Sequence, residues 1–338
     1  MTGSHQGNPQ PGRSCPLHYR YAPASLNRPP EIVADTLYVI GGLYGNAPAL
    51  RAVAALAEAE HKPATLVFNG DFNWFNSDAA GFAAINKTVL AHHALRGNVE
   101  TELAGEDDAT GCGCAYPDSV SDTEVACSNS MLARLRATSR AFPGLRARLA
   151  ALPMNRVAAV GGLRVAIVHG DCESLAGWAY DESALADATG IATAAAHCTA
   201  ARARIIACSH TCLPVAIKLD TVHGPCALFN NGATGMPNFA GTPFGVITRI
   251  ATTPAQSPAA LYGTVIDGVH IDALAVAYDH AQWQREFMAN WPAGSAGHQS
   301  YHQRITAGPR YGLNRAMRAG IHINTALLRE LRTSGERK

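Results

Sequence analysis

The segment Leu66-Val-Phe-Asn-Gly-Asp71 places an aspartate directly after a short apolar run and an Asn-Gly turn. The same plan, an apolar run that leads into a potential metal ligand, recurs in Ala94-Leu-Arg-Gly-Asn98, Val165-Ala-Ile-Val-His-Gly-Asp171 and Ile205-Ile-Ala-Cys-Ser-His210. Short apolar runs bounded by Gly and Asn are typical of buried strands. Polar groups at the carboxyl ends of such strands converge on one crevice. We therefore expect Asp71, Asn98, His169 and His210 to lie close together.

Predicted strands and helices alternate along most of the chain. Strands are expected at 36–40, 66–69, 93–96, 164–168, 204–208, 227–229 and 245–250. Helices are expected after Asn46, whose amide can cap a first turn, and at 131–152, 181–201, 281–290 and 315–331. The arginines of 131–152 should form a solvated face: Arg134, Arg136, Arg140, Arg146 and Arg148. This alternation, with a strand-rich second half, predicts an α/β core with more than one sheet.

Changes in composition divide the chain into three parts. Residues 1–35, rich in Gly, Pro, Ser and Asn, predict an N-terminal arm, and residues 36–270 predict the main domain, with a polar loop insertion at 101–130. Residues 271–338 predict a C-terminal helical extension. Within the insertion, Cys112-Gly-Cys114 has a tighter spacing than zinc ribbons use, so two free thiols are the expected state.

The composition excludes several classes of protein. Hydrophobic residues make up 47% and charged residues 16% of the 338 residues, and the formal net charge is +1. These values are typical of a folded globular protein and give no basic field for nucleic acid or an anionic membrane. No apolar run reaches the roughly 18–20 residues of a membrane helix, and the first residues lack the apolar segment of a secretory signal. With nine scattered cysteines, we expect reduced thiols and a cytoplasmic location.

The four strand-end residues form a mixed set of nitrogen and oxygen ligands. Such a set suits Mn, Fe or Zn better than Ca or Mg, which prefer shells of oxygen alone. Each residue taken singly has an ordinary explanation, since Asp after Gly is common turn chemistry and the chain has 14 histidines. The hypothesis of a metal site therefore depends on the occurrence of all four in order.

That order resembles the calcineurin-like metallophosphoesterase superfamily between about residues 36 and 250. The matching blocks are Gly70-Asp71, Gly97-Asn98-Val99-Glu100, His169-Gly170-Asp171, Ser209-His210-Thr211-Cys212 and Phe229-Asn-Asn-Gly-Ala-Thr-Gly235. No single block is specific, but five in sequence at reasonable spacings are. The resemblance implies a four-layer α/β/β/α sandwich with two mixed sheets, here followed by the C-terminal helical extension.

The departures from the family pattern are concentrated in one of its two metal sites. The resemblance puts Gly42, Tyr44, Asp71 and Cys212 at the first site, where three of the four family ligands are replaced. The second site is complete, with Asp71, Asn98, His169 and His210. The resemblance therefore implies a divergent member with a degenerate first site and one divalent transition-metal ion, Mn, Fe or Zn. Val99 also replaces the histidine of the third block.

The function implied is that of a metal-dependent phosphoesterase with one metal ion. It would hydrolyse a small phosphate mono- or diester, with a metal-bound hydroxide as nucleophile. Arg96, Asn230 and Asn231 are weaker candidates for phosphate contact. One alternative is a non-catalytic protein that binds a phosphorylated or other anionic ligand, or a regulatory protein. Another is a different metal-dependent chemistry, in which Tyr44 and Cys212 rebuild the first site around Fe(III) or copper.

Overall fold

Strand β2 (Thr36–Ile40) shows why the chain folds in layers. The computed structural model describes residues 10–106, 109–256 and 258–324. Every residue of β2 is buried, and Leu37 and Val39 face one apolar core whereas Tyr38 and Ile40 face another. Because successive side chains of a strand point to opposite faces, β2 must have a layer of structure on each side.

The sheet that contains β2 has seven strands in the order β13-β11-β12-β10-β2-β3-β4. Strands β2, β3 and β4 run parallel, and the pairs that involve β10 to β13 are antiparallel. The bounds of the remaining strands are β3 (Ala64–Asn69), β4 (His93–Leu95), β10 (Gly245–Ala251), β11 (Ala260–Ile266), β12 (Val269–Val276) and β13 (His322–Ile323).

A second sheet of six strands lies beneath the first, in the order β1-β5-β6-β7-β9-β8. Strands β6, β7 and β9 are parallel neighbours, and the β5–β6 and β8–β9 pairs are antiparallel. The bounds are β1 (Ile32–Ala34), β5 (Asn155–Val160), β6 (Leu163–Val168), β7 (Ile205–Cys208), β8 (Pro214–Thr221) and β9 (Gly224–Asn231). Both sheets are therefore mixed, as the sequence predicted.

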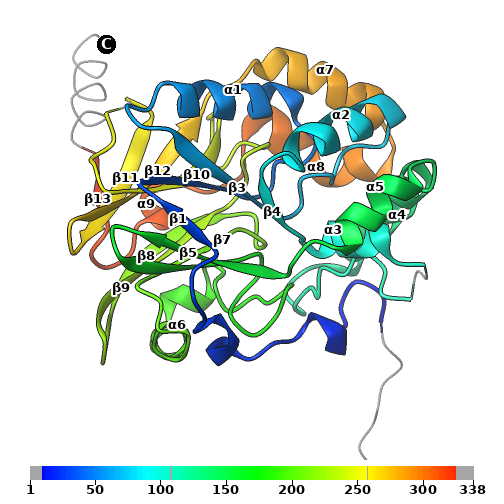
Figure 1. Cartoon of the computed structure of the whole chain (residues 1–338). Helices are drawn as coiled ribbons and strands as arrows, with labels where there is room; N and C mark the ends of the chain where they lie inside the picture. The colour runs from blue at the N-terminus through cyan, green and yellow to red at the C-terminus, as the bar shows by residue number, and fades with distance from the viewer. Residues whose placement is uncertain (1–9, 107–108, 257, 325–338) are drawn as a thin grey trace, which may run out of the picture.

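Helices cover the outer faces of the two sheets (Figure 1). Above the seven-stranded sheet lie α1 (Ala47–Glu58), α2 (Ala79–Val89) and α7 (His280–Asn290), and α6 (Ala188–Ala201) lies below the six-stranded sheet. The other helices are α3 (Asn98–Ala104), α4 (Asp122–Ser139), α5 (Pro143–Ala150), α8 (Ala296–Ala307), α9 (Leu313–Ala316) and the 3₁₀ turns Leu17–Tyr19, Pro23–Leu26 and Ala184–Ala186. Three apolar cores separate the layers, and the four-layer α/β/β/α sandwich is confirmed.

The predicted start of α1 is also confirmed. The side chain of Asn46 accepts a hydrogen bond from the amide of Ala49 at 2.8 Å, which satisfies one of the free amides of the first turn. The single helix expected at 131–152 was wrong, because it is two helices. The first begins earlier, where Ser121 and Glu124 form a capping box, and Pro143 opens the second.

Arg136 was wrongly assigned to a solvated face. Its side chain is buried, donates to Glu102 Oε2 at 2.7 Å and also donates to the carbonyl oxygen of Glu102. The Tyr19 hydroxyl donates to the other carboxylate oxygen at 2.6 Å. The helical periodicity placed Arg136 on a polar stripe, but α3 packs against that stripe and brings the carboxylate with it.

The described parts of both ends contribute strands to the sheets. Residues 10–35 carry β1, which pairs with β5, and Tyr19 packs into the fold. The boundary expected at residue 271 falls inside β12, so helices α7 and α8 follow a strand of the main sheet. Instead of a helix from residue 315, the chain forms the short α9 and then β13; residues 325–331 of that prediction lie outside the described residues.

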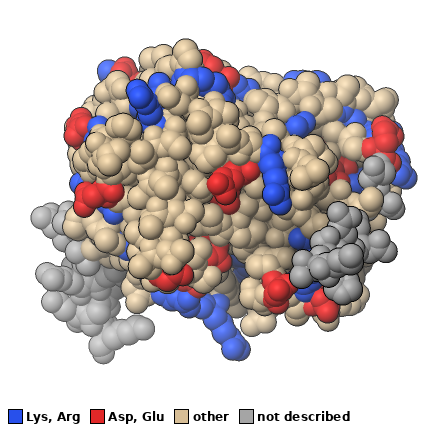
Figure 2. Space-filling view, turned by 90° about the horizontal axis from the view of Figure 1, so that it is seen from below, with Lys and Arg blue, Asp and Glu red and all other residues tan. Residues whose placement is uncertain are grey.

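The surface and the helices bear on the classes of partner considered above. Figure 2 shows acidic and basic side chains intermingled on the face seen from below, in keeping with the net charge of +1. Among the described residues, none of the helices is long and apolar enough to cross a membrane.

We predict that Glu102→Ala will lower the free energy of unfolding by about 3–5 kcal/mol, because it leaves the buried Arg136 guanidinium without its carboxylate. Urea unfolding measures the change. The matched control is Glu106→Ala, which removes the exposed partner of Arg146 and should cost less than about 1 kcal/mol. Equal losses in the two variants would contradict a structural role for the buried pair.

Candidate metal centre

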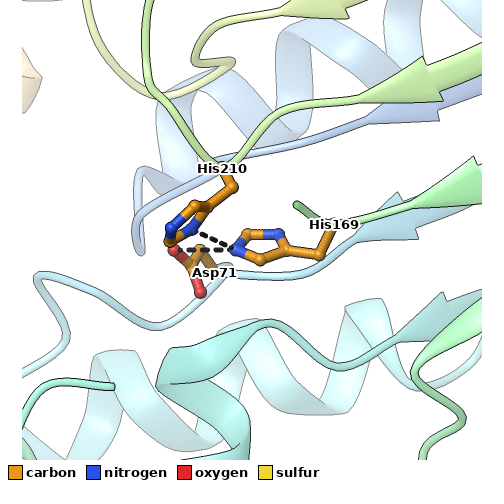
Figure 3. Close-up of side chains that lie close together, drawn as sticks. All are labelled: Asp71, His169 and His210. Carbon is orange, nitrogen blue, oxygen red and sulfur yellow. Dashed lines mark hydrogen bonds and ion pairs between the residues drawn. The ribbon is translucent and has the colours of Figure 1, made fainter. Parts of the chain in front are cut away.

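The four predicted ligands come from the carboxyl ends of parallel strands in both sheets. Asp71 follows β3 and Asn98 opens α3 just after β4, whereas His169 follows β6 and His210 follows β7. Figure 3 shows Asp71, His169 and His210 pointing toward one another from these separate strand ends. The centre therefore lies where the two sheets meet, and all four side chains are buried.

His169 Nε2 lies close to one atom of each of the other three side chains. It is 3.1 Å from His210 Nδ1, 3.2 Å from Asn98 Oδ1 and 3.3 Å from Asp71 Oδ2. Ligand atoms about 2.1 Å from an ion with tetrahedral geometry are about 3.4 Å from one another. The side chains of Asp71, His169 and His210 also satisfy the mutual spacing of a metal-binding group. The observed separations therefore fit a single small ion.

The opposite end of three of these side chains is bound to a backbone carbonyl. His169 Nδ1 is 2.9 Å from the oxygen of Asn69, and His210 Nε2 is 3.0 Å from the oxygen of Cys114. The amide nitrogen of Asn98 donates to the oxygen of Cys112 at 2.9 Å. A carbonyl oxygen only accepts, so each of these contacts fixes a proton on the distal atom and a lone pair on the atom that faces the centre.

Four electron-pair donors thus converge: two imidazole nitrogens, an amide oxygen and a carboxylate oxygen. Atoms of this kind repel one another at about 3 Å unless a cation lies between them. A proton on His169 Nε2, which the charge of Asp71 favours when no ion is bound, removes the lone pair of only one of the four donors, whereas a metal ion would bind all four. The residues present therefore fit a divalent transition metal with mixed N/O ligands.

The pKa values of the same groups reflect this convergence. Burial acts to lower the pKa of His169, but Asp71, the Asn69 carbonyl and Glu100 together outweigh burial and raise it above the ordinary value. Burial acts to raise the pKa of Asp71, yet His169 holds it below the usual range. Burial and then His169 lower the pKa of His210 to about 4, so its imidazole is neutral and available as a ligand at neutral pH.

Glu100 is a supporting residue whose role the sequence did not reveal. Its Oε2 accepts from the amide of Asp71 at 2.7 Å and from the amide of Gly97 at 3.1 Å. Asp71 has φ 52°, in the left-handed region that non-glycine residues rarely adopt, and the Glu100 carboxylate holds the backbone there. Burial, followed by the charge of Asp71, raises the pKa of Glu100 to about 7. The Gly-x-x-Glu spacing of a helix N-terminus was the signal available.

Tyr44 and Cys212 lie side by side, with the phenol oxygen 2.9 Å from the thiol sulfur. Burial raises the pKa of the phenol and of the thiol, which keeps both protonated. The Cys212 thiol also donates to the carbonyl oxygen of His210 at 3.2 Å. At Gly42, an added Cβ would meet the Tyr44 ring at 2.9 Å. These side chains fill the first-site positions and bond to one another, an arrangement that does not favour a rebuilt site.

The structure does not bring the three weaker candidates to the centre. Arg96 donates to the carbonyl oxygen of Ala150. Asn230 donates to the Tyr180 carbonyl and the Thr211 hydroxyl, and Asn231 donates to two backbone carbonyls. These contacts join neighbouring segments of the fold, and none of the three residues lines the pocket at the centre.

A narrow pocket of about 40 Å³ leads to the centre and is lined mainly by aromatic side chains. Its walls are Tyr44, Asp71, Trp74, Asn98, Val99, Cys114, Tyr116, Trp178, His210, Cys212 and Tyr301. Trp178 packs edge-on against the His210 ring and donates its indole N–H to the Cys114 carbonyl. This aromatic lining could not be predicted from the sequence, because its residues come from five separate segments.

Comparisons with known proteins agree with the fold. A metallophosphoesterase from Sphaerobacter thermophilus matches 81% of this chain and 100% of its own, with 18% identity and a TM-score of 0.52. A hypothetical protein from Pyrococcus horikoshii OT3 matches 82% and 100%, with 14% identity and a TM-score of 0.54. No protein-family model and no curated protein matches the sequence. The chain therefore has the fold of the metallophosphoesterases, and the resemblance seen in the sequence is confirmed at that level.

We predict one transition-metal ion per chain, lost in His210→Ala and in Asp71→Ala because each removes a converging ligand. Cys212→Ser should keep the ion, since the thiol bonds to Tyr44 and to a carbonyl. Elemental analysis after reconstitution with Mn, Fe or Zn provides the count. His197→Gln is the control, because this buried histidine bonds to Tyr180 outside the centre. Two ions per chain, or metal loss in Cys212→Ser, would contradict the one-ion site.

Proposed function

We propose that this chain is a metal-dependent phosphoesterase that uses one divalent transition-metal ion. The observation that carries the proposal is the convergence of four lone pairs. The backbone carbonyls of Asn69, Cys112 and Cys114 orient three of the side chains that provide them. The ion would be held by Asp71, Asn98, His169 and His210. The fold it shares with metallophosphoesterases supports a hydrolase.

A divalent ion in this position would polarise a phosphoryl oxygen and lower the pKa of a bound water. The residues of the chain orient the side chains that would hold the ion. The carbonyl contacts fix the tautomers of both histidines, and Glu100 fixes the strained backbone of Asp71. The aromatic walls limit the number of waters that reach the centre, and exclusion of water strengthens electrostatic interactions there.

Proton transfer to the leaving group has little support from the pocket. Val99 lines the pocket at the position where the family pattern has a histidine. Tyr44 and Cys212 also line it, but their raised pKa values make both weak acids. Esters whose leaving group departs without a proton, such as aryl esters, are therefore the best substrates for this site.

A second candidate is a protein that binds a phosphate ester without hydrolysing it. The observation in its favour is the hydrogen-bonded pair of Tyr44 and Cys212, which occupies the positions of the family's other metal ligands. The presence of all four ligands of the family's second metal site favours an enzyme over a binding protein. The experiments below separate the two candidates.

The reconstituted protein should hydrolyse an activated aryl phosphate ester, and removal of the metal with a chelator should abolish the reaction. His169→Ala should reduce kcat/KM by at least about 100-fold, because it removes one of the four converging donor atoms. Release of 4-nitrophenolate measures the rate, and His197→Gln again serves as the control. Metal-loaded protein with no activity above the chelated sample would reject the enzyme in favour of the binding protein.

A second ion should raise activity if the crevice still accepts phosphate esters. In the triple variant Gly42→Asp, Tyr44→His, Cys212→His, loss of the Tyr44 ring clears the space that an aspartate at position 42 needs. Two ions clamp the attacking and leaving oxygens together, so the rate should rise at least about tenfold. The variant that keeps Gly42 and carries the other two substitutions is the control.

Circular dichroism and a metal count must accompany that assay, because Gly42 has φ 62° and an aspartate there is strained. A folded triple variant with two ions and no gain in rate over the parent would contradict the expectation that the missing second ion limits hydrolysis of phosphate esters.

A further inference from the structure

The charge of the pocket sets a limit on the charge of its ligand. Among the described residues that line it, Asp71 is the one carboxylate and neither lysine nor arginine is present. Arg304 lies beside Cys212, but its guanidinium donates to the carbonyl oxygens of Cys212 and Pro237. At the surface of the pocket, a divalent ion and the Asp71 carboxylate would together carry a charge of about +1; the Glu100 carboxylate lies behind Asp71 and is bound there by the backbone amides of Asp71 and Gly97. A monoanion would neutralise this charge, whereas a dianion would leave one negative charge in a mostly apolar pocket, which is costly.

The shape of the pocket limits what lies around the reacting phosphate. The pocket is narrow, so the substituents of an ester whose phosphate reaches the centre must extend toward the mouth of the pocket. Tyr116, Trp178 and Tyr301 are half-buried lining residues, whereas Trp74 and Tyr44 are buried deeper. The Tyr116 and Trp178 rings are 5.8 Å apart between centroids. A flat aromatic group can pack against rings arranged in this way.

We infer that the substrates are phosphodiesters, which carry one negative charge, with an aromatic substituent that packs on Tyr116, Trp178 or Tyr301. This inference rests on the proposed function and narrows it from phosphate esters in general. The aromatic group can be a simple aryl ring or a nucleobase, because both offer a flat π face.

In the reaction, the oxygen of water bonds to phosphorus as the bond from phosphorus to the aryl oxygen breaks. The electron pair of the broken bond leaves on the aryloxide, and at pH 8 both protons of the water pass to the buffer. An aryloxide needs no proton to depart, in agreement with the valine at position 99.

Four esters with the same 4-nitrophenolate leaving group separate charge from aromatic contact. They are 4-nitrophenyl phosphate, methyl 4-nitrophenyl phosphate, phenyl 4-nitrophenyl phosphate and thymidine 5′-(4-nitrophenyl phosphate). At pH 8 the first carries two negative charges and the others one. We expect kcat/KM for the methyl diester to exceed that for the monoester at least tenfold. The kcat/KM for the phenyl or the thymidine diester should exceed that for the methyl diester about five- to tenfold. Comparison of the phenyl diester with the thymidine diester identifies the preferred aromatic group.

Variants at Trp178 test whether the wall causes the preference. The ratio of the rates for the phenyl and methyl diesters should fall toward one in Trp178→Leu and remain in Trp178→Phe, which keeps a ring. The ratio is the readout because Trp178 contacts His210 and the Cys114 carbonyl, so a change in metal content alters both rates equally. A monoester as good as the methyl diester, or a phenyl diester no better than it, would overturn the inference.

Binding provides a readout that needs no turnover. Quenching of tryptophan fluorescence in the metal-loaded protein should show diphenyl phosphate binding at least about fivefold more tightly than dimethyl phosphate or phenyl phosphate. If no ester is hydrolysed but this order of binding holds, the proposed enzyme is rejected and the ligand class is upheld. If hydrolysis occurs but phenyl phosphate binds best, the enzyme is upheld and the ligand class is overturned.

Discussion

The carbonyl oxygen of Asn69 joins the two sheets at the point where the centre forms. Asn69 is the last residue of β3 in the upper sheet. Its carbonyl oxygen contacts His169 Nδ1 and accepts from the Ser209 hydroxyl, and these two residues follow strands of the lower sheet. Gly70 and Gly97 permit this approach, since a Cβ at either would lie under 3 Å from backbone or ligand atoms. The geometry of the centre depends on this contact between the sheets, because Asp71 and Asn98 come from one sheet and the histidines from the other.

The convergence of Asp71, Asn98, His169 and His210 could be predicted because the signal is local. Each follows an apolar strand by one to three residues, and parallel strands bring their carboxyl ends to one edge. The two-sheet architecture followed from the order of the blocks. The local pattern of a helix misplaced Arg136, because the surroundings of this side chain depend on how α3 packs against α4. It also extended a helix across Pro143, although proline is a common first residue of a new helix.

The surroundings of the ligands were beyond prediction because they depend on distant contacts. The carbonyls of Cys112 and Cys114 orient Asn98 and His210, yet they lie in the insertion at 101–130, whose polar composition indicated only a loop. A backbone carbonyl has no sequence signature. The position after a strand made reasonable candidates of Arg96, Asn230 and Asn231, but each of these side chains donates a hydrogen bond to a backbone carbonyl.

The loop that orients these ligands is itself fastened by the beginning of the chain. Gly12 exchanges backbone hydrogen bonds with Thr110 and Tyr116, and a Cβ at Gly113 would lie 2.4 Å from the Tyr19 hydroxyl. Docking of this segment and binding of an ion at the centre would therefore favour the same loop conformation. Two events that favour one conformation strengthen each other equally, whichever comes first. An ion at the centre would thus stabilise the attachment of the N-terminal segment, and that attachment would set part of the affinity for the ion.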